Sequence, residues 1–165
     1  AVCLRGNVNS GVGATVDVLF VNGSPGDQNR VVFASVGQSI TIHLDAAPAG
    51  PSGGRYALWI WSHPPANAVR LVRSGIDVGC LVNPSPFTRT LHPQPIRCLR
   101  GASVPASVCR GVRTLPAPPS APWTVTRTTG VGRPGNFSLQ GILQDPGSAN
   151  STHFSVTNAV ILRVQ

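Results

Sequence analysis

Residues 55–62, RYALWIWS, decide the fold class of this chain. The run is rich in aromatic and branched side chains, which are typical of β-strands. Strand geometry places Trp59 and Trp61 on one face, about 7 Å apart, and Leu58 and Ile60 on the other. A strand that is apolar on both faces is either covered on both or presents one face to a partner. Three interpretations follow: burial in the core, a contact between subunits, or a platform on which sugars stack.

Similar patterns recur on both sides of this run. Residues 39–46 (SITIHLDA) alternate between apolar and polar side chains, as a strand with one buried face does. Residues 30–36 (RVVFASV) form another candidate strand, and only Gly37 and Gln38 separate the two. A two-residue junction containing Gly between such runs predicts a β-hairpin. Further strands are expected at residues 15–22, 69–72, 77–82, 123–129, 136–144 and 154–164.

The composition changes at residues 83–122, which hold nine of the 16 prolines. Because proline removes a ladder donor and restrains φ, this stretch is expected to be mostly irregular, with helix limited to a turn or two. The chain is therefore predicted to be all-β: a single β-sandwich domain over residues 1–165, immunoglobulin-like or jelly-roll-like, with a long Pro-rich, disulfide-tied loop region. The expected core residues are Ile40, Ile42, Leu44, Leu58, Ile60, Leu139, Val160 and Ile161, although Val160 and Ile161 cannot both face one side.

Four cysteines, Cys3, Cys80, Cys98 and Cys109, contain no CxxC spacing, which disfavours a zinc knuckle. In a short, turn-rich chain they indicate two disulfides and an oxidising compartment. Of the three possible pairings we prefer Cys98–Cys109, which closes a short Pro-containing loop, together with Cys3–Cys80. The chain opens at Ala1, as a processed secretory protein would. We therefore expect a secreted protein, extracellular or at the cell surface.

The ionisable side chains are unusual, because all 13 cations are Arg and all five anions are Asp. The absence of Lys, Glu and Met removes most strong helix formers. The net charge of +8 raises the question of nucleic acid, but the arginines are dispersed and form no basic run. Solubility, or attraction to an anionic surface or polymer, explains the charge equally well. No apolar run approaches the roughly 20 residues of a membrane helix, so no membrane span and no specific nucleic-acid partner are expected.

No motif for catalysis or for a cofactor is assembled in the sequence. The GxSxG nucleophile elbow is absent, and SxxK motifs are impossible without Lys. A glycosidase needs two carboxylates, but Asp27 and Asp145 lie in turn sequences, where they are expected to bond the turn backbone. His43 and Asp45 would share one strand face and could ligate a metal, but exposure to solvent is the favoured interpretation. We therefore predict no enzyme, no metal site and no cofactor.

Three stretches resemble uncharacterised, predicted secreted bacterial β-rich proteins: residues 18–23 (VLFVNG), 55–61 (RYALWIW) and 156–163 (VTNAVILR). They are strand-and-turn signatures distributed over most of the chain. The resemblance implies export and carries no activity.

The function that we expect is that of a non-catalytic structural protein, a self-assembling subunit of an extracellular fibre or surface layer. The apolar terminal strand, with Val160, Leu162 and Val164, is the candidate subunit contact, because an exposed edge can accept another strand. The alternative is a carbohydrate-binding module that uses exposed Trp59, Trp61 or Trp123. The expected partners are further copies of the chain and a cell-surface polysaccharide.

Overall fold

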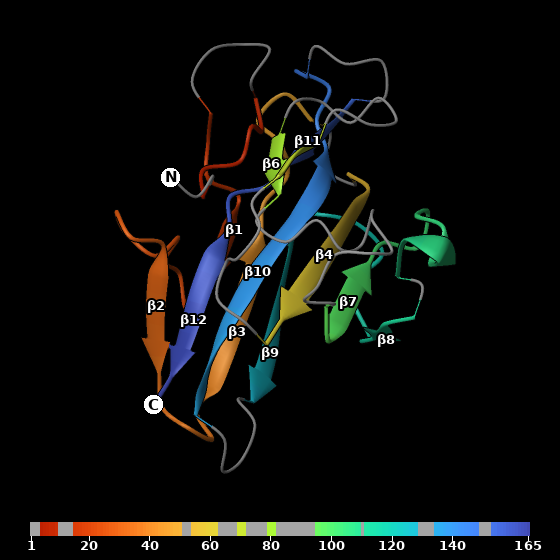
Figure 1. Ribbon diagram of the computed structural model, residues 1–165. Helices are drawn as coiled ribbons and strands as arrows, with labels where there is room; N and C mark the ends of the chain where they lie inside the picture. Colours follow the sequence, from red (N-terminus) through yellow and green to blue (C-terminus); the bar gives the residue numbers. More distant parts are fainter. Residues whose placement is uncertain are drawn as a thin grey trace.

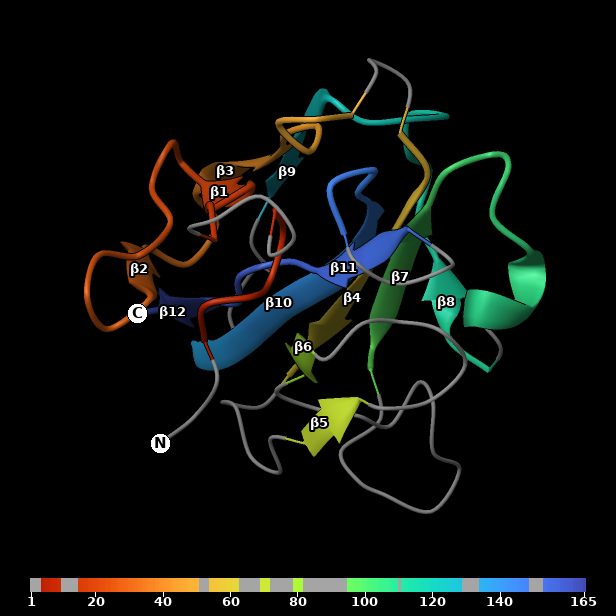
Figure 2. The ribbon, with the colours of Figure 1, turned by 90° about the horizontal axis from the view of Figure 1, so that it is seen from above.

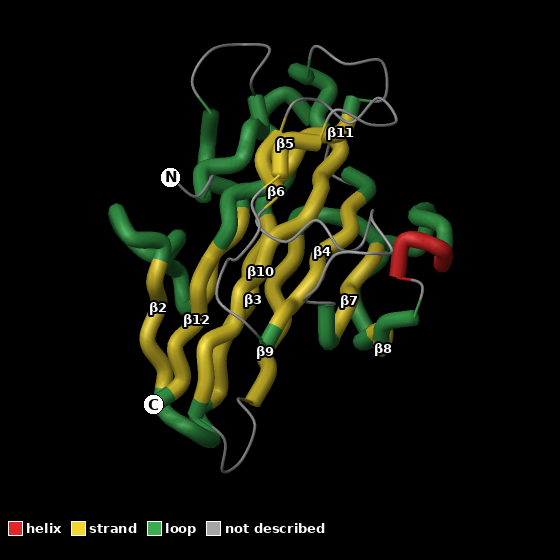
Figure 3. Tube along the Cα trace, in the orientation of Figure 1, coloured by secondary structure: helices red, strands yellow, loops and turns green. Residues whose placement is uncertain are grey.

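A computed structural model describes residues 4–9, 15–50, 54–62, 69–71, 79–81, 95–109, 111–128, 134–148 and 153–165, with backbone alone for 69–71 and 79–81. The strands are β1 (Leu19–Val21), β2 (Val31–Ala34), β3 (Ser39–Leu44), β4 (Tyr56–Trp61), β5 (Val69–Leu71), β6 (Gly79–Leu81), β7 (Arg97–Arg100), β8 (Arg113–Thr114), β9 (Trp123–Thr128), β10 (Gly135–Gln144), β11 (Phe154–Val156) and β12 (Val160–Val164). One short 3₁₀ helix, η1 (Ala106–Cys109), completes the described elements and is the helix drawn in red in Figure 3. In the part of the chain that the structure describes, the prediction of an all-β fold is confirmed.

Two sheets face each other (Figures 1 and 2). The larger has the strand order β2-β12-β10-β4-β7-β8, with β11 paired to β10, and the smaller has the order β1-β3-β9. Most pairs are antiparallel, but β2–β12 and β7–β8 are parallel. In Figure 2 the pair β5–β6 lies beyond the larger sheet, on the side away from the smaller one. The choice between an immunoglobulin-like and a jelly-roll-like sandwich stays a prediction.

The main core fills the space between the two sheets. Alternation along each strand places one set of side chains inward, so β3 contributes Ile40, Ile42 and Leu44 from the smaller sheet. The larger sheet contributes Leu58, Leu139 and Val160 among others, and the partly buried Ile60 packs against them. Seven of the eight expected core residues therefore lie in or against this cluster. Ile161 is the exception, because its neighbour Val160 takes the inward position.

A second apolar cluster covers the outer face of the larger sheet. It contains Trp59 and Trp61 from β4, and the disulfide between Cys98 on β7 and Cys109 in η1. The segment around η1 packs over this face, where the Trp59 indole N–H donates to the Val108 carbonyl at 3.3 Å. The Cys98–Cys109 prediction is confirmed. Cys3 lies outside the described residues and only the backbone of Cys80 is described, so Cys3–Cys80 stays a prediction.

The predicted hairpin at Gly37 and Gln38 is wrong. β2 pairs with β12 in the larger sheet, whereas β3 pairs with β1 and β9 in the smaller one, so the short turn crosses from one sheet to the other. Local spacing correctly predicts a tight turn. Which strands pair, however, depends on the apolar surface that segments distant in the sequence bury together. Gly37 has φ +76°, which the turn requires.

The region expected to be mostly irregular, residues 83–122, holds two short strands in its described part, and its description as a long Pro-rich loop stays a prediction. Within the described part of residues 83–122, β7 pairs with β4 over four residues and β8 pairs with β7. Proline is compatible with these strands because Pro95 and Pro116 flank them rather than interrupt them.

No helix among the described residues is long and apolar enough to cross a membrane.

Candidate functional site

The three tryptophans expected to form a binding surface are all buried. Trp59 and Trp61 have no exposed surface, and Trp123 is 5% exposed between the sheets, with its ring 5.2 Å from that of Tyr56. The premise of exposed Trp residues is therefore wrong: η1 and its neighbours cover one face of β4, and the smaller sheet covers the other. A sugar cannot stack on these rings without a rearrangement of the core.

The terminal strand is also not a free edge. β12 lies between β2 and β10 and is hydrogen-bonded to both within the same chain. Val160, Leu162 and Val164 are buried in the main core. The prediction that they form a subunit contact is wrong, because the strand that ends the sequence is an interior strand of the sheet. The strand at this edge of the larger sheet is instead β2.

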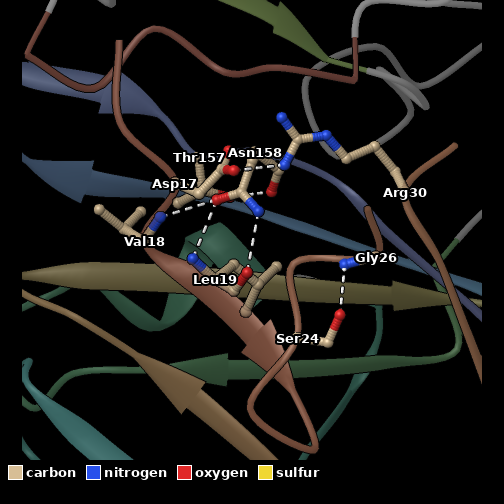
Figure 4. A network of polar contacts seen from close by, with 8 residues as sticks. All are labelled: Asp17, Val18, Leu19, Ser24, Gly26, Arg30, Thr157 and Asn158. Atoms are coloured by element: carbon tan, nitrogen blue, oxygen red, sulfur yellow. Dashed lines mark hydrogen bonds and ion pairs between the residues drawn. The ribbon is translucent and has the colours of Figure 1, made fainter. Parts of the chain in front are cut away.

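A buried polar network holds the segment before β1 against the larger sheet (Figure 4). The Asn158 side chain, between β11 and β12, accepts hydrogen bonds from the backbone N–H groups of Val18 and Leu19, both at 2.9 Å. Its amide nitrogen donates to the Leu19 carbonyl at 2.8 Å. Asn158 is fully buried and satisfies backbone groups that a neighbouring strand would otherwise satisfy.

The turn from β1 to β2 is shaped by an ion pair and by left-handed backbone. Arg30 Nη1 lies 2.6 Å from Asp17 Oδ2, and the Arg30 side chain is only 10% exposed. Arg30 and Asp27 both have positive φ, at 59° and 50°. A Cβ on Gly26, at φ +89°, would come within 2.6 Å of the Arg30 backbone, so only glycine fits there. The strained conformation is maintained because the ion pair and close packing determine it together.

This turn borders an open groove of about 790 Å³ beside β2. Its charged lining consists of Arg5, Asp17, Asp27 and Arg30, and the exposed Phe33 is one of its apolar lining residues. Two cations and two anions leave no excess of either sign. The groove therefore has no electrostatic preference for a charged small molecule, and its distinctive feature is the strand beside it.

The outer edge of β2 is open at Phe33. The Arg30 carbonyl accepts from Ile161 N–H and the Ala34 carbonyl from Gln165 N–H, so the even-numbered residues direct their backbone groups at β12. The odd-numbered ones face away. Val31 N–H donates to the Gly26 carbonyl at 2.8 Å, and Ser35 N–H donates to the Gln38 side chain at 2.8 Å.

Between these two capped positions, the Phe33 N–H and C=O have no partner among the described residues. The Phe33 side chain is 60% exposed, the largest exposure of any large apolar side chain in the described part of the chain. Sequence reasoning placed Phe33 in a strand and did not single it out. Its alternation with Val32 and Ala34 was the available signal, but whether an outward position is covered depends on the other elements.

A hydrogen-bonded row of three side chains crosses the outer face of the smaller sheet. Asp45 Oδ1 lies 2.9 Å from His43 Nε2, and His43 Nδ1 lies 2.7 Å from Thr124 Oγ1. A carboxylate, an imidazole and a hydroxyl in series resemble the order used in nucleophilic hydrolysis. Here, however, the His43 and Asp45 side chains lie on an open sheet face, with 34% and 50% of their surface exposed. The groove that could hold a substrate is lined by other residues, beside β2. We interpret the row as a cross-strand network that orders this face.

His43 and Asp45 do share a face, as their spacing predicts, but their facing atoms bond each other. In the described part of the chain, no three His, Cys, Asp or Glu side chains lie close enough together to hold a metal ion.

Comparison with protein-family models, with curated proteins and with solved structures finds no match to this chain.

Proposed function

We propose that this chain is a secreted, non-catalytic structural protein that self-associates through the open edge of β2. The observation that carries the proposal is Phe33, whose backbone N–H and C=O and whose ring are all exposed at that edge. An unpaired strand edge is a template for another strand, and natural proteins usually block it with charge or proline. β2 (VVFA) carries neither.

The edge is complementary to itself. Two copies related by a two-fold axis can place Phe33 opposite Phe33 in an antiparallel pair that exchanges two N–H···O=C bonds. The two rings then lie on one face with their Cβ atoms about 5 Å apart, close enough to pack. The outward N–H groups of Val31 and Ser35 are already hydrogen-bonded within the chain, so a new ladder is limited to the stretch around Phe33. Each contact is therefore weak. Several weak contacts in a layer or fibre reinforce one another.

Net charge opposes this association. Two copies that each carry +8 repel at low ionic strength, whereas a contact made of backbone bonds and phenyl rings is not itself screened. We therefore expect added salt to strengthen self-association.

Secretion is supported by the Cys98–Cys109 disulfide, which is typical of oxidising compartments. The resemblance to predicted secreted β-rich proteins agrees with this part of the proposal.

Sedimentation velocity from micromolar to millimolar concentration tests the proposal. The wild-type chain is expected to shift toward dimers and larger species as concentration and salt rise. Phe33→Lys places a charge at the edge and is expected to stay monomeric. Thr126→Lys is the matched control, because it adds the same charge to β9, an edge strand of the smaller sheet, at an exposed position.

A wild-type chain that remains monomeric at millimolar concentration in high salt would overturn the proposal. Equal loss of association in Phe33→Lys and Thr126→Lys would show that net charge, rather than the β2 edge, controls it. Thermal unfolding of both variants verifies that they fold.

A further inference from the structure

Three arginines gather at the margin of the sandwich opposite to β2. Arg97 on β7 and Arg113 on β8 are direct register partners in a parallel pair, so their side chains leave the sheet on the same face. Leu99, two residues after Arg97 on β7, is in the core between the sheets, and Leu115, just beyond β8 and two residues after Arg113, packs against it. Both arginines therefore project from the face that looks toward the smaller sheet.

The third arginine comes from the smaller sheet. On β9, Trp123 and Val125 face the core, so Arg127 extends from the same inner face near the end of the strand. Its guanidinium donates to the Pro116 carbonyl at 2.5 Å, and Pro116 follows Arg113 by three residues. In Figure 1, β8, the start of β7 and the end of β9 all lie in the lower part of the molecule. Arg97, Arg113 and Arg127 thus line one margin of the two sheets, and together they form the arginine cluster.

No described carboxylate neutralises this cluster. Asp17 pairs with Arg30, and Asp45 contacts His43. Asp145 is buried and accepts hydrogen bonds from neutral groups, and Asp27 lines the groove beside β2. Asp77 lies outside the described residues.

The hydrogen bonds of the arginine cluster leave donors available. Arg97 donates to the Ile96 carbonyl at 2.7 Å, and Arg127 to the carbonyls of Thr126 and Pro116. Arg113 is exposed, and its guanidinium has no partner in the described part of the chain. Neutral carbonyls leave three positive charges uncompensated, so an anion at this margin would gain attraction from all three.

We propose that the arginine cluster binds an acidic polysaccharide through its carboxylate groups. Guanidinium groups form paired hydrogen bonds with planar carboxylates, which makes arginine well suited to this partner. Proteins that bind single-stranded nucleic acid combine a positively charged groove with exposed aromatic side chains on which the bases stack. Among the described residues, Trp123 on β9 and Tyr56, whose hydroxyl donates to the Pro118 carbonyl, are aromatic but buried. A partner recognised by charge and hydrogen bonds alone therefore fits this margin better than one recognised by stacking.

Titration calorimetry with polygalacturonate as the probe tests this proposal, at protein concentrations where sedimentation shows monomer. Neutral dextran and a single-stranded DNA oligonucleotide are the comparison polymers. The wild-type chain is expected to bind polygalacturonate, to bind it more weakly as salt rises, and to ignore dextran. This salt dependence is opposite to that expected for self-association, so failure of one proposal is distinguishable from failure of the other.

Two charge-matched variants locate the site. The variant Arg97→Gln, Arg113→Gln, Arg127→Gln is expected to bind at least about tenfold more weakly, since each exposed contact contributes roughly two- to fivefold. The control Arg5→Gln, Arg55→Gln, Arg163→Gln removes the same charge from exposed positions elsewhere and should change affinity by less than about threefold. Arg113→Gln alone, at an exposed position, is expected to fold normally and still weaken binding by about two- to fivefold.

Equal losses in the two triple variants would overturn the proposal, because net charge alone would then explain binding. Absence of polygalacturonate binding by the wild-type chain, or tighter binding of the DNA oligonucleotide, would also overturn it. Unchanged binding by the Arg113→Gln variant would show that Arg113 does not contact the polymer and would overturn the proposed three-arginine site.

Discussion

Replacing Asn158 with alanine should be among the most destabilising single changes in this protein. The side chain makes three hydrogen bonds to the backbone of Val18 and Leu19, which are 1% and 0% exposed. Asn158→Ala leaves two N–H groups and one carbonyl buried without partners. Each such group costs about 1–3 kcal/mol, so the sum is about 3–6 kcal/mol after water reaches some of them. A domain of ordinary stability has only about 5–15 kcal/mol in total.

Denaturant unfolding followed by tryptophan fluorescence measures this loss. All three tryptophans are buried, so their emission reports global unfolding. Asn136→Ala is the matched control: Asn136 is exposed on β10, and we expect a change within about 0.5 kcal/mol. Hydrogen exchange adds a local measurement, because the amides of Val18 and Leu19 should lose more protection than those of β10. A loss below about 1 kcal/mol with an unchanged denaturant slope would show that the Asn158 hydrogen bonds contribute little to stability.

Three further outcomes are expected. Burial raises the pKa of Tyr56 from 10.0 to about 12; the folded state therefore holds this proton more tightly, and stability falls as pH rises from about 10 toward 12. Tyr56 is the single tyrosine, so phenolate absorbance checks this directly, and a midpoint near 10 in the folded protein would contradict it. Ile42→Ala and Leu58→Ala should each cost about 2–5 kcal/mol in denaturant unfolding, and losses below about 1 kcal/mol at both would show that the inward faces are misassigned. Deleting residues 160–165 removes an interior strand and should abolish cooperative unfolding, whereas a folded, non-associating product would show that β12 is dispensable to its own core.

Much of the fold follows from local patterns in the sequence. The alternation of Ile40, Ile42 and Leu44 correctly predicts which face of β3 is buried, because the period of a strand is a local property. The two apolar faces of residues 56–61 correctly indicate a strand with both faces covered, as one of the three interpretations. The short Cys98–Cys109 loop correctly predicts a disulfide. Each of these conclusions needs only neighbouring residues.

The candidate sites, in contrast, depend on contacts between distant segments. Sequence adjacency predicts that residues 30–36 pair with residues 39–46, yet β2 pairs with β12, more than a hundred positions away. The same long-range pairing makes β12 an interior strand and leaves Phe33 at the edge. The arginine cluster is invisible in the sequence, because Arg97, Arg113 and Arg127 come together only when two sheets pack.

The element type, the buried face of the central strands and one disulfide thus follow from the amino-acid order alone, since steric period, apolar pattern and loop length are properties of short segments. Which strands are edges, which tryptophans are covered and which charges lack a partner become visible only in the packed chain. This is because strand pairing and sheet packing depend on how much apolar surface the whole chain buries. A residue's exposure is therefore a property of everything that packs around it.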